Sequence, residues 1–475
     1  MAASMRAVPR IVIAGVSSGV GKTTVTVAIA RALTARGLRV ALFKCGPDYL
    51  DPTYHARAVG LVCQNLDGWM MGREAVRGTF LAATQGVDVA LIEGVMGLFD
   101  GASPTSEEGS TAEIAKWLEA PVVLVVDAGG MARSVAALVA GFASFDPALN
   151  VAGVVANRVG SRGHAELLQR ALRSSSFLGA LPRDAASEFP ERHLGLRTAD
   201  EQAVPESLFD AWGAVAAEWV RLDAVLDLAR SAPVLAEEPA VSPPGSSSVR
   251  ARIGIAQDEA FHFYYADNLR RLEALGATLV RFSPVHDARL PDVDGVYLGG
   301  GYPEVHAAAL AANHAMRADV LAFAQTGGPI YAECGGLMFL TQAIRTLDGA
   351  RHEMVGLLPT ETCMREKLQA LGYVEVETQT RSLLGEKGTR FRGHQFRYSE
   401  LDPEPPAALV ERAYSLRRRR GGETTREGYR CNNVVASYVH AHWASNPNVA
   451  AALVEACAAF RSDARRYLHP AEHSA

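Results

Sequence analysis

Between residues 11 and 181, short apolar runs alternate with segments whose apolar positions recur at helical spacing. The first run, residues 11–13, is β-branched, and residues 23–36 then follow a helical pattern that stops at Gly37. Strands that are buried on both faces of a sheet form continuous apolar runs of this kind. On this basis further strands are predicted at residues 39–43, 87–92, 121–127, 151–156 and 177–181. The alternation predicts an α/β fold with a doubly wound, mostly parallel sheet.

The pattern stops and restarts at residues 231–250, which are rich in proline, serine and glycine and show little periodicity. Such a composition is typical of a linker between domains. We therefore predict an N-terminal domain over residues 1–230 and a second α/β domain over residues 251–475. In the second domain, strands are predicted at residues 252–256, 278–282, 295–298 and 329–332, and helices near residues 265–275 and 337–344.

The segment IVIAGVSSGVGKTT joins the first strand to the first helix. A glycine-rich turn before a helix N-terminus directs backbone N–H groups at phosphate oxygens, which predicts a nucleotide site. In this motif Lys22 would reach the β and γ phosphates and the Thr23 hydroxyl would bind magnesium. The first glycine is Gly15, so the loop is one residue longer than the usual spacing. The other residues predicted to bind ATP in this loop are Ser18, Gly19, Gly21 and Thr24.

Polar residues follow several of the predicted strands. In open α/β sheets, ligands bind at the carboxyl ends of the strands. Asp48 and Asp51 follow residues 39–43, and Glu93 follows residues 87–92, where it is the predicted acidic partner of the metal. Solvated carboxylates in surface loops are the alternative. The amide of Asn157 could read the edge of adenine, or it could belong to an ordinary turn.

A cysteine, Cys334, lies between a predicted strand and a helix in the segment YAECGG. A sharp strand-to-helix turn of this kind exposes a nucleophile, and the helix N-terminus is expected to lower the pKa of the thiol. The thiol needs a histidine as its base. In ASYVHAHWASNP, a strand would place Tyr438, His440 and His442 on one face, so spacing alone does not choose between the two histidines. Buried, inert thiols are expected at the remaining positions, least securely at the first: Cys45, Cys63, Cys363, Cys431 and Cys457.

Composition narrows the class of protein further. The 475 residues carry a net charge of −5, which argues against nucleic acid as the main partner. No apolar run is long enough to span a membrane, and the first ten residues lack the apolar core of a secretion signal. The six cysteines show no paired spacing, which favours a reduced cytoplasm over a disulfide framework or a zinc site.

Over nearly its whole length, the chain resembles the cobyrinic acid a,c-diamide synthases, which are ATP-using, glutamine-dependent amidases of corrinoid biosynthesis. The resemblance is carried, in order, by GVSSGVGKTT, FKCGPDYLDPTYH, NLDGWMMG, EGVMGLFDG, ANRVGS, LPRD with PERHLGL, DEAFHFYY, LGGGYPE, YAECGGLMFL, RGHQFRYS and ASYVHAHWASNP. It implies a dethiobiotin synthetase-like P-loop domain for ATP and the tetrapyrrole, followed by a class I glutamine amidotransferase-like domain. The longer phosphate loop is similar to that of both families.

By this resemblance, Thr23, Asp48 and Glu93 would hold Mg²⁺. The residues expected in loops that serve the macrocycle carboxylates and the acyl-phosphate step are Asp48, Tyr49, Leu50, Asp51 and Asp100.

The resemblance also implies roles in the second domain. Cys334 would attack the glutamine carboxamide, and His440 matches the family's catalytic histidine, with His442 as the second choice. The oxyanion would be steadied by the N–H groups of Gly335 and of Gly300 or Gly301. Two departures stand out. No His-Pro-Glu segment follows His440, so the third member of the triad stays open. Glutamine replaces the glutamate expected in the segment Gly393-His394-Gln395-Phe396.

The implied reaction is amidation of the a and c acetates of cobyrinate or hydrogenobyrinate through acyl phosphates, with ammonia passed between the domains along a closed passage. Alternatives are a sirohydrochlorin-type diamide synthase or cobyric acid synthase, although GPDYLDP and YVHAHWASNP favour the a,c-diamide branch. A partitioning-type ATPase with an inert second module is another, but such ATPases usually carry a lysine where this loop has Ser17. The central metal of the macrocycle, the order of the two amidations and the oligomeric state, a homodimer included, stay open.

Overall fold

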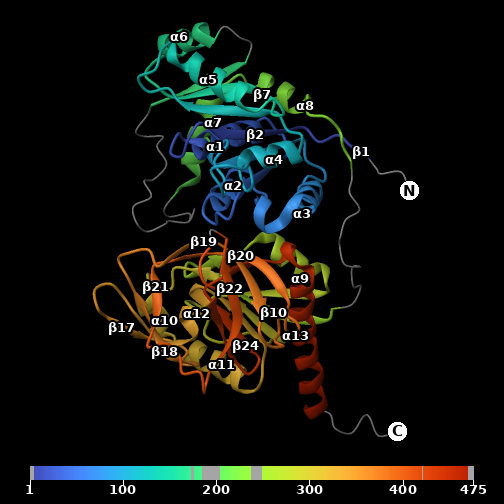
Figure 1. Cartoon of the computed structure of the whole chain (residues 1–475), viewed down its shortest axis with the longest axis vertical. Helices are drawn as coiled ribbons and strands as arrows, with labels where there is room; N and C mark the ends of the chain where they lie inside the picture. Colours follow the sequence, from blue (N-terminus) through green and yellow to red (C-terminus); the bar gives the residue numbers. More distant parts are fainter. Residues whose placement is uncertain (1–4, 173–175, 184–203, 237–248, 420, 469–475) are drawn as a thin grey trace. The chain divides into compact units, whose positions relative to one another are not determined.

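The computed structural model describes residues 5–172, 176–183, 204–236, 249–419 and 421–468. The segment PERHLGL and most of the predicted linker lie outside these ranges. The chain forms two compact units, Met1–Val241 and Ser242–Ala475 (Figure 1). At the start of the predicted linker, β9 (Leu235–Ala236) pairs with β1 (Met5–Arg6). The Arg10 guanidinium also donates to the carbonyl of Pro233. Residues 233–236 therefore pack on the N-terminal unit.

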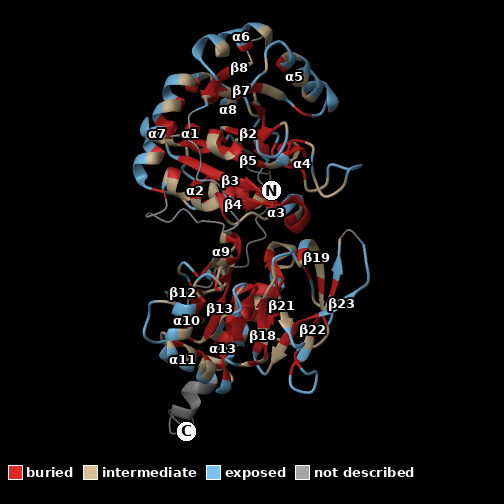
Figure 2. Cartoon of the chain, turned by 90° about the vertical axis from the view of Figure 1, so that its left-hand side faces the viewer, coloured by how far each residue is buried: buried red, intermediate tan, exposed pale blue. Residues whose placement is uncertain are grey.

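The N-terminal unit is built on a parallel sheet with the strand order β4-β3-β5-β2-β6-β7-β8. Its strands are β2 (Arg10–Gly15), β3 (Val40–Cys45), β4 (Gln64–Leu66), β5 (Val89–Gly97), β6 (Val122–Asp127), β7 (Val151–Val159) and β8 (Phe177–Pro182). The apolar runs of the sequence are the buried interior of this sheet (Figure 2). The predicted doubly wound α/β fold is confirmed.

Helices α1 to α6 lie between these strands in the sequence, and α7 and α8 follow the last strand. They are α1 (Lys22–Ala35), α2 (Asp51–Val59), α3 (Gly68–Ala83), α4 (Thr111–Trp117), α5 (Ser134–Phe145), α6 (Arg162–Leu172), α7 (Glu206–Trp219) and α8 (Leu222–Arg230). Helix α1 is buried along most of its length because it packs against α2, α7 and the sheet. The phosphate loop, which runs from β2 to α1, is therefore anchored at both ends in the core. No helix in the described ranges is both long and apolar enough to cross a membrane.

The C-terminal unit contains a mixed sheet with the strand order β12-β10-β13-β15-β24-β23-β22-β19-β20-β25. The first five strands are parallel: β12 (Ala277–Phe282), β10 (Ala251–Ala256), β13 (Gly295–Leu298), β15 (Ile330–Glu333) and β24 (Val434–Ser437). The other five continue antiparallel: β23 (Thr425–Cys431), β22 (Glu411–Arg418), β19 (Ala370–Thr378), β20 (Arg390–Arg397) and β25 (His440–His442).

The smaller sheets and helices complete this unit. A second sheet contains β16 (Thr341–Arg345), β17 (Arg351–Glu353), β18 (Leu358–Met364) and β21 (Ser399–Asp402), and β11 (Phe261–Phe263) pairs with β14 (Gly300–Gly301). The helices are α9 (Ala266–Ala274), α10 (Ala307–Ala312), α11 (His314–Gln325), α12 (Gly335–Leu340), η2 (Trp443–Ser445) and α13 (Pro447–Leu468).

Two predictions about local structure in this unit are wrong. The helix predicted over residues 337–344 ends at Leu340, and β16 follows directly because its backbone pairs with β17 and β18. Tertiary pairing overrides the helical spacing there. The single strand predicted through Tyr438, His440 and His442 is divided: β24 ends at Ser437, and β25 lies at the far edge of the sheet beside β20.

Candidate active sites

The phosphate loop has the backbone geometry that its glycines predict. Gly19 and Gly21 have φ values of 78° and 87°, a region that other residues rarely occupy, and Gly21 caps the N-terminus of α1. Ser18 and Gly19 are exposed, whereas Lys22 is buried and its Nζ donates to the carbonyl of Ser17 at 3.2 Å. The lysine is thus held by the loop that it is predicted to serve.

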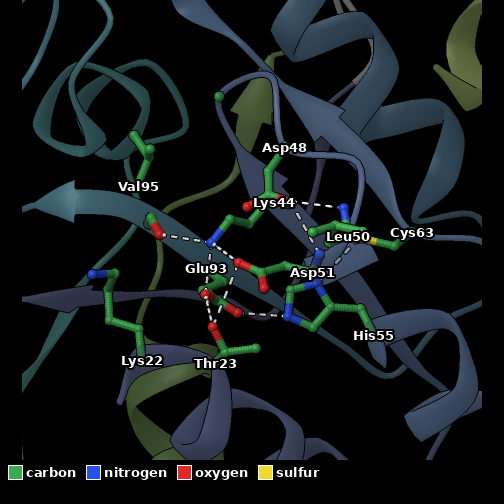
Figure 3. A network of polar contacts seen from close by, with 12 residues as sticks. Lys22, Thr23, Lys44, Asp48, Leu50, Asp51, His55, Cys63, Glu93 and Val95 are labelled. Carbon is green, nitrogen blue, oxygen red and sulfur yellow. Dashed lines mark hydrogen bonds and ion pairs between the residues drawn. The ribbon is translucent and has the colours of Figure 1, made fainter. Parts of the chain in front are cut away.

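A charged network lies beside this loop and is formed by the carboxyl end of β3, the middle of β5 and the first turns of α2 (Figure 3). Glu93 Oε1 accepts hydrogen bonds from the Thr23 hydroxyl and from Lys44 Nζ, each at 2.7 Å. The same Lys44 ammonium lies 2.7 Å from Asp51 Oδ2. On the other side of Glu93, Oε2 is 2.5 Å from His55 Nε2. Two carboxylates and two basic groups therefore share one buried centre.

The members of this network stabilise one another's charged forms. Burial lowers the pKa of Lys44, but Asp51 and Glu93 outweigh burial and raise it above its ordinary value. Burial likewise lowers the pKa of His55, yet the Glu93 carboxylate and Cys63 raise it to about 10. The pKa of Glu93 is lowered, because Lys44, followed by His55, overcomes the effect of burial. At neutral pH the centre therefore contains the Lys44 and His55 cations and the Glu93 anion.

The acidic residues predicted for the metal site differ in their contacts with Thr23. Glu93 contacts Thr23 as expected, but the second carboxylate near Thr23 is Asp51, whose Oδ2 is 3.5 Å from the hydroxyl. Asp48 Oδ1 instead accepts from the N–H groups of Leu50 and Asp51, so it caps the start of α2. Burial, together with Asp51, raises the pKa of Asp48 to about 6.

The other residues predicted for this site lie around its rim. Asp100 is exposed and accepts from the N–H of Gly97, while Tyr49 is half-buried and Leu50 is buried. Asn157 is buried, and its Nδ2 donates to the carbonyl of Val20, so this amide supports the phosphate loop. Its predicted contact with adenine stays a prediction.

Sequence reasoning did not single out Lys44 or His55, although both lie in the segment FKCGPDYLDPTYH. The available signal was a lysine at a strand end that is followed by two aspartates. Nor is Cys63 an isolated buried thiol, since its sulfur is 3.5 Å from His55 Nδ1.

The oxygen atoms at this centre fit Mg²⁺ brought in with a nucleotide. Hydroxyl and carboxylate oxygens converge from Thr23, Glu93 and Asp51, and Mg²⁺ in nucleotide sites takes one or two carboxylates together with substrate phosphates. Among the described residues, no group of three or more His, Cys, Asp and Glu is arranged to hold a metal by itself. The fit is therefore to a metal that shares its ligands with phosphates.

In the C-terminal unit, Cys334 occupies the sharp turn that the sequence predicts. It has a φ of 47°, a strained value for a residue with a side chain, and it lies between β15 and α12. Its N–H donates to the carbonyl of Ser437 at 2.7 Å, and the N–H of Gly336 donates to that of Gly299 at 3.0 Å. These bonds fix the turn against β24 and the loop after β13.

The pKa of the Cys334 thiol is raised, contrary to the expectation that the helix N-terminus lowers it. Burial raises the pKa of Cys334 to about 12, and Glu304 adds to this effect, while Arg397 and the N–H of Gly335 lower the pKa by less. Helix α12 has only six residues, and its dipole does not overcome desolvation. A base must therefore take the proton when substrate binds.

His440 is the histidine that contacts the predicted oxyanion loop. A Cβ built on Gly300 would overlap the His440 ring, and His440 Nδ1 lies 4.0 Å from Glu333 Oε2. Burial lowers the pKa of His440 to about 3, so its imidazole is neutral and can accept a proton. His442 instead packs against Tyr265, with ring centroids 4.6 Å apart.

The glycines predicted to form the oxyanion hole lie together. A Cβ at Gly335 would be 3.0 Å from the backbone nitrogen of Gly301, so Gly301 lies directly against the first residue after the thiol. Gly300 and Gly301 form β14, which pairs with β11. Together with the neutral imidazole, this arrangement suits acyl transfer from an amide to the thiol.

Comparisons with known proteins match each unit separately. Residues 11–196 match the model of the CobQ/CobB/MinD/ParA nucleotide binding domain. Residues 252–448 match the model of the CobB/CobQ-like glutamine amidotransferase domain. The fold and the two sites thus define a glutamine-dependent ligase, in which a nucleotide-binding unit is joined to an amidotransferase unit.

Relatives of nearly equal length identify the family. The cobyrinate a,c-diamide synthase of Leptospira interrogans (strain Fiocruz L1-130) is 52% identical over 452 residues, which are 95% of this chain and 98% of the relative. The enzyme of the same name from Syntrophotalea carbinolica is 50% identical, with 94% and 98% covered. That of Priestia megaterium is 41% identical, with 96% and 98% covered. The chain belongs to the cobyrinate a,c-diamide synthase family.

Proposed function

We propose that this protein converts the a and c acetate side chains of cobyrinate to amides, using ATP and glutamine, as a step of cobalamin biosynthesis. The observation that carries the proposal is the presence, in one chain, of a phosphate loop beside buried carboxylates and of a strained thiol turn in the unit that holds a neutral histidine against Gly300. The names of the full-length relatives supply the substrate.

At the first site, Lys22 and the N–H groups of residues 18–24 bind the phosphates of ATP. Thr23, Glu93 and Asp51 are the residues that would hold Mg²⁺, which when bound neutralises phosphate charge. A substrate carboxylate attacks the γ-phosphorus, ADP leaves, and an acyl phosphate forms. Lys44 faces this reaction as a fixed cation, and Tyr49, Asp48 and Asp100 lie in the loops that would contact the macrocycle.

At the second site, the Cys334 sulfur attacks the glutamine carboxamide as its proton passes to His440. The N–H groups of Gly335 and of Gly300 or Gly301 stabilise the oxyanion. His440 then protonates the departing nitrogen, so ammonia leaves and a thioester remains, which water hydrolyses to glutamate. The ammonia attacks the acyl phosphate, and inorganic phosphate is released with formation of the amide.

The substrate is tested by incubating the purified protein with Mg²⁺, ATP, glutamine and one of three tetrapyrroles: cobyrinate, hydrogenobyrinate or nickel sirohydrochlorin. Mass spectrometry should show two carboxylates replaced by amides in cobyrinate, with one ADP and one glutamate formed per amide. Amidation of nickel sirohydrochlorin alone would reject the proposed substrate.

A further inference from the structure

A buried carboxylate, Glu333, immediately precedes the nucleophile and has no role in the reaction described above. It is the last residue of β15 and is 1% exposed. Three groups donate to it: the hydroxyls of Tyr297 and Tyr331 at 2.9 and 2.7 Å, and the N–H of Ala441 at 2.9 Å. Ala441 directly follows His440, so Glu333 joins the strand of the thiol to the strand of the histidine.

The usual position for a third catalytic residue holds a histidine in this chain. Two residues after His440 comes His442, whose Nδ1 accepts from the N–H of Ala444 and whose ring packs on Tyr265. The His442 side chain has no carboxyl group, and its contacts are with Ala444 and Tyr265. The carboxylate near His440 is Glu333, whose Oε2 lies 4.0 Å from Nδ1.

We propose that Glu333 is the positioning residue for His440 in glutamine hydrolysis, in place of an acid that follows the histidine. A carboxylate on the Nδ1 side leaves Nε2 as the nitrogen that takes the thiol proton. When that proton arrives, Nδ1–H and the carboxylate attract each other as a charged pair, and the 4.0 Å separation can shorten to a hydrogen bond. Burial raises the pKa of Glu333 to about 7, although the hydrogen bonds from Tyr331, Ala441 and Tyr297 oppose this rise, so the charged pair forms above that pH.

The surroundings of the ring favour this arrangement. His394 stacks on His440, with centroids 5.0 Å apart and an interplanar angle of 20°, and β20 pairs with β25 at these same two residues. Phe263 lies on the ring as well, with centroids 6.4 Å apart. The ring is thus held by its neighbours, and Glu333 is the buried acid within ion-pair distance of its edge.

The test is Glu333→Gln in the full chain, since the amide keeps the shape and removes the charge. We expect kcat of glutamine hydrolysis to fall by at least about 10²-fold, with KM for glutamine and ammonia-driven amidation nearly unchanged. The inference rests on the proposed function, but the two fail differently. A wild-type protein that does not hydrolyse glutamine would reject the function, whereas a folded variant with unchanged kcat would reject only the role of Glu333.

The matched control is Glu427→Gln. Glu427 is another buried carboxylate of the same unit, and it accepts from the Ser437 hydroxyl and the Tyr438 N–H rather than contacting His440. We expect this variant to keep kcat within about threefold of the wild type. Equal losses in both variants, or loss of ammonia-driven amidation in Glu333→Gln, would assign Glu333 a merely structural role and overturn the proposal.

A spectroscopic measurement on the wild type keeps the proposal testable if the variant does not fold. Addition of the Cys334 thiol to the aldehyde analogue of glutamine, L-glutamate γ-semialdehyde, would mimic the tetrahedral intermediate, in which the thiol proton rests on His440 opposite the oxyanion. With ¹⁵N-labelled histidine, the Nδ1 proton of His440 should shift downfield as its hydrogen bond to a carboxylate forms. An Nδ1 proton that stays at the position of a solvent-bonded imidazole would contradict the proposal.

Discussion

The two units each bury a polar centre, but the groups of one centre are ionised and those of the other are neutral. Beside the phosphate loop, Lys44 and His55 are held as cations by Glu93 and its neighbours. Beside the thiol turn, burial keeps Cys334 protonated and His440 neutral. The first centre is ionised before substrate binds, whereas the second retains its proton until glutamine arrives. Buried groups are therefore ionised where opposite charges are packed together and neutral where they are not.

Removal of the Lys44 ammonium should have the largest effect on activity and stability of the changes considered. Lys44→Met leaves Glu93 and Asp51 without the ammonium that lies 2.7 Å from each. We expect loss of amidation by about 10³-fold with either glutamine or ammonia, and a loss of about 3–5 kcal/mol in the free energy of unfolding. The measurements are amide formation and denaturant unfolding. The control is Arg31→Met, which breaks two more exposed pairs, with Glu206 and Asp210, and should cost less than about 1 kcal/mol.

Two glycine substitutions should separate the centres by activity. A Cβ at Gly300 would overlap His440, and one at Gly21 would overlap Asn157 behind the phosphate loop. Gly300→Ala should lower glutamine hydrolysis by about 10²-fold and spare ammonia-driven amidation, because a small displacement misaligns the base. Gly21→Ala should impair amidation with either nitrogen source. The reverse assignment of losses would contradict the division of roles.

The pH dependence of local stability should have opposite signs in the two units. His440 has its pKa lowered to about 3, so its stabilising contribution is present above pH 6.5 and is lost as the pH falls toward 3. His55 has its pKa raised to about 10, so its contribution is present below pH 6.5 and is lost as the pH rises toward 10. Each slope is at most about 1.4 kcal/mol per pH unit.

Hydrogen exchange of the full chain, followed peptide by peptide from pH 5 to pH 9, measures both slopes together. His55→Gln should flatten the alkaline slope around residues 51–66 and leave β25 unaffected. If the local stability of both units changed with pH in the same direction, the proposed difference in charge between their centres would be contradicted.

The smallest effect concerns the resting thiol. Because the pKa of Cys334 is raised to about 12, alkylation by iodoacetamide should keep accelerating up to pH 9 without a plateau. A plateau below pH 8, read by mass spectrometry of the Cys334 peptide, would indicate a thiolate that is already present in the absence of glutamine.

The sequence could predict those parts of the fold and the sites that depend on local pattern, but not those that depend on long-range packing. The parallel strands, the phosphate loop and the thiol turn follow from continuous apolar runs and glycine placement, which are local signals. The division of residues 434–442 between β24 and β25 does not, because distant strands pair with each segment. That Asp51 rather than Asp48 lies beside Thr23 does not follow from the sequence either, because only the folded backbone shows that Asp48 accepts from the N–H groups of Leu50 and Asp51.

Lys44 and Glu333 show that local sequence does not reveal every residue of the candidate sites. Each lies beside a predicted residue in the sequence, yet its importance depends on partners 49 and 108 positions away, Glu93 and Ala441. Likewise, the pKa of Cys334 could not be predicted from its motif, because burial, which only the packed structure shows, outweighs the helix N-terminus.

The division of labour between the two centres is tested most directly with Cys334→Ser and ¹⁵N labelling. Cobyrinate, Mg²⁺ and ATP would be supplied with either amide-¹⁵N glutamine or ¹⁵N ammonium chloride, and the amides weighed by mass spectrometry. We expect the variant to incorporate no ¹⁵N from glutamine and to match the wild type with ammonium. Incorporation of glutamine nitrogen at the wild-type rate would contradict the assignment of Cys334 as the residue that releases ammonia.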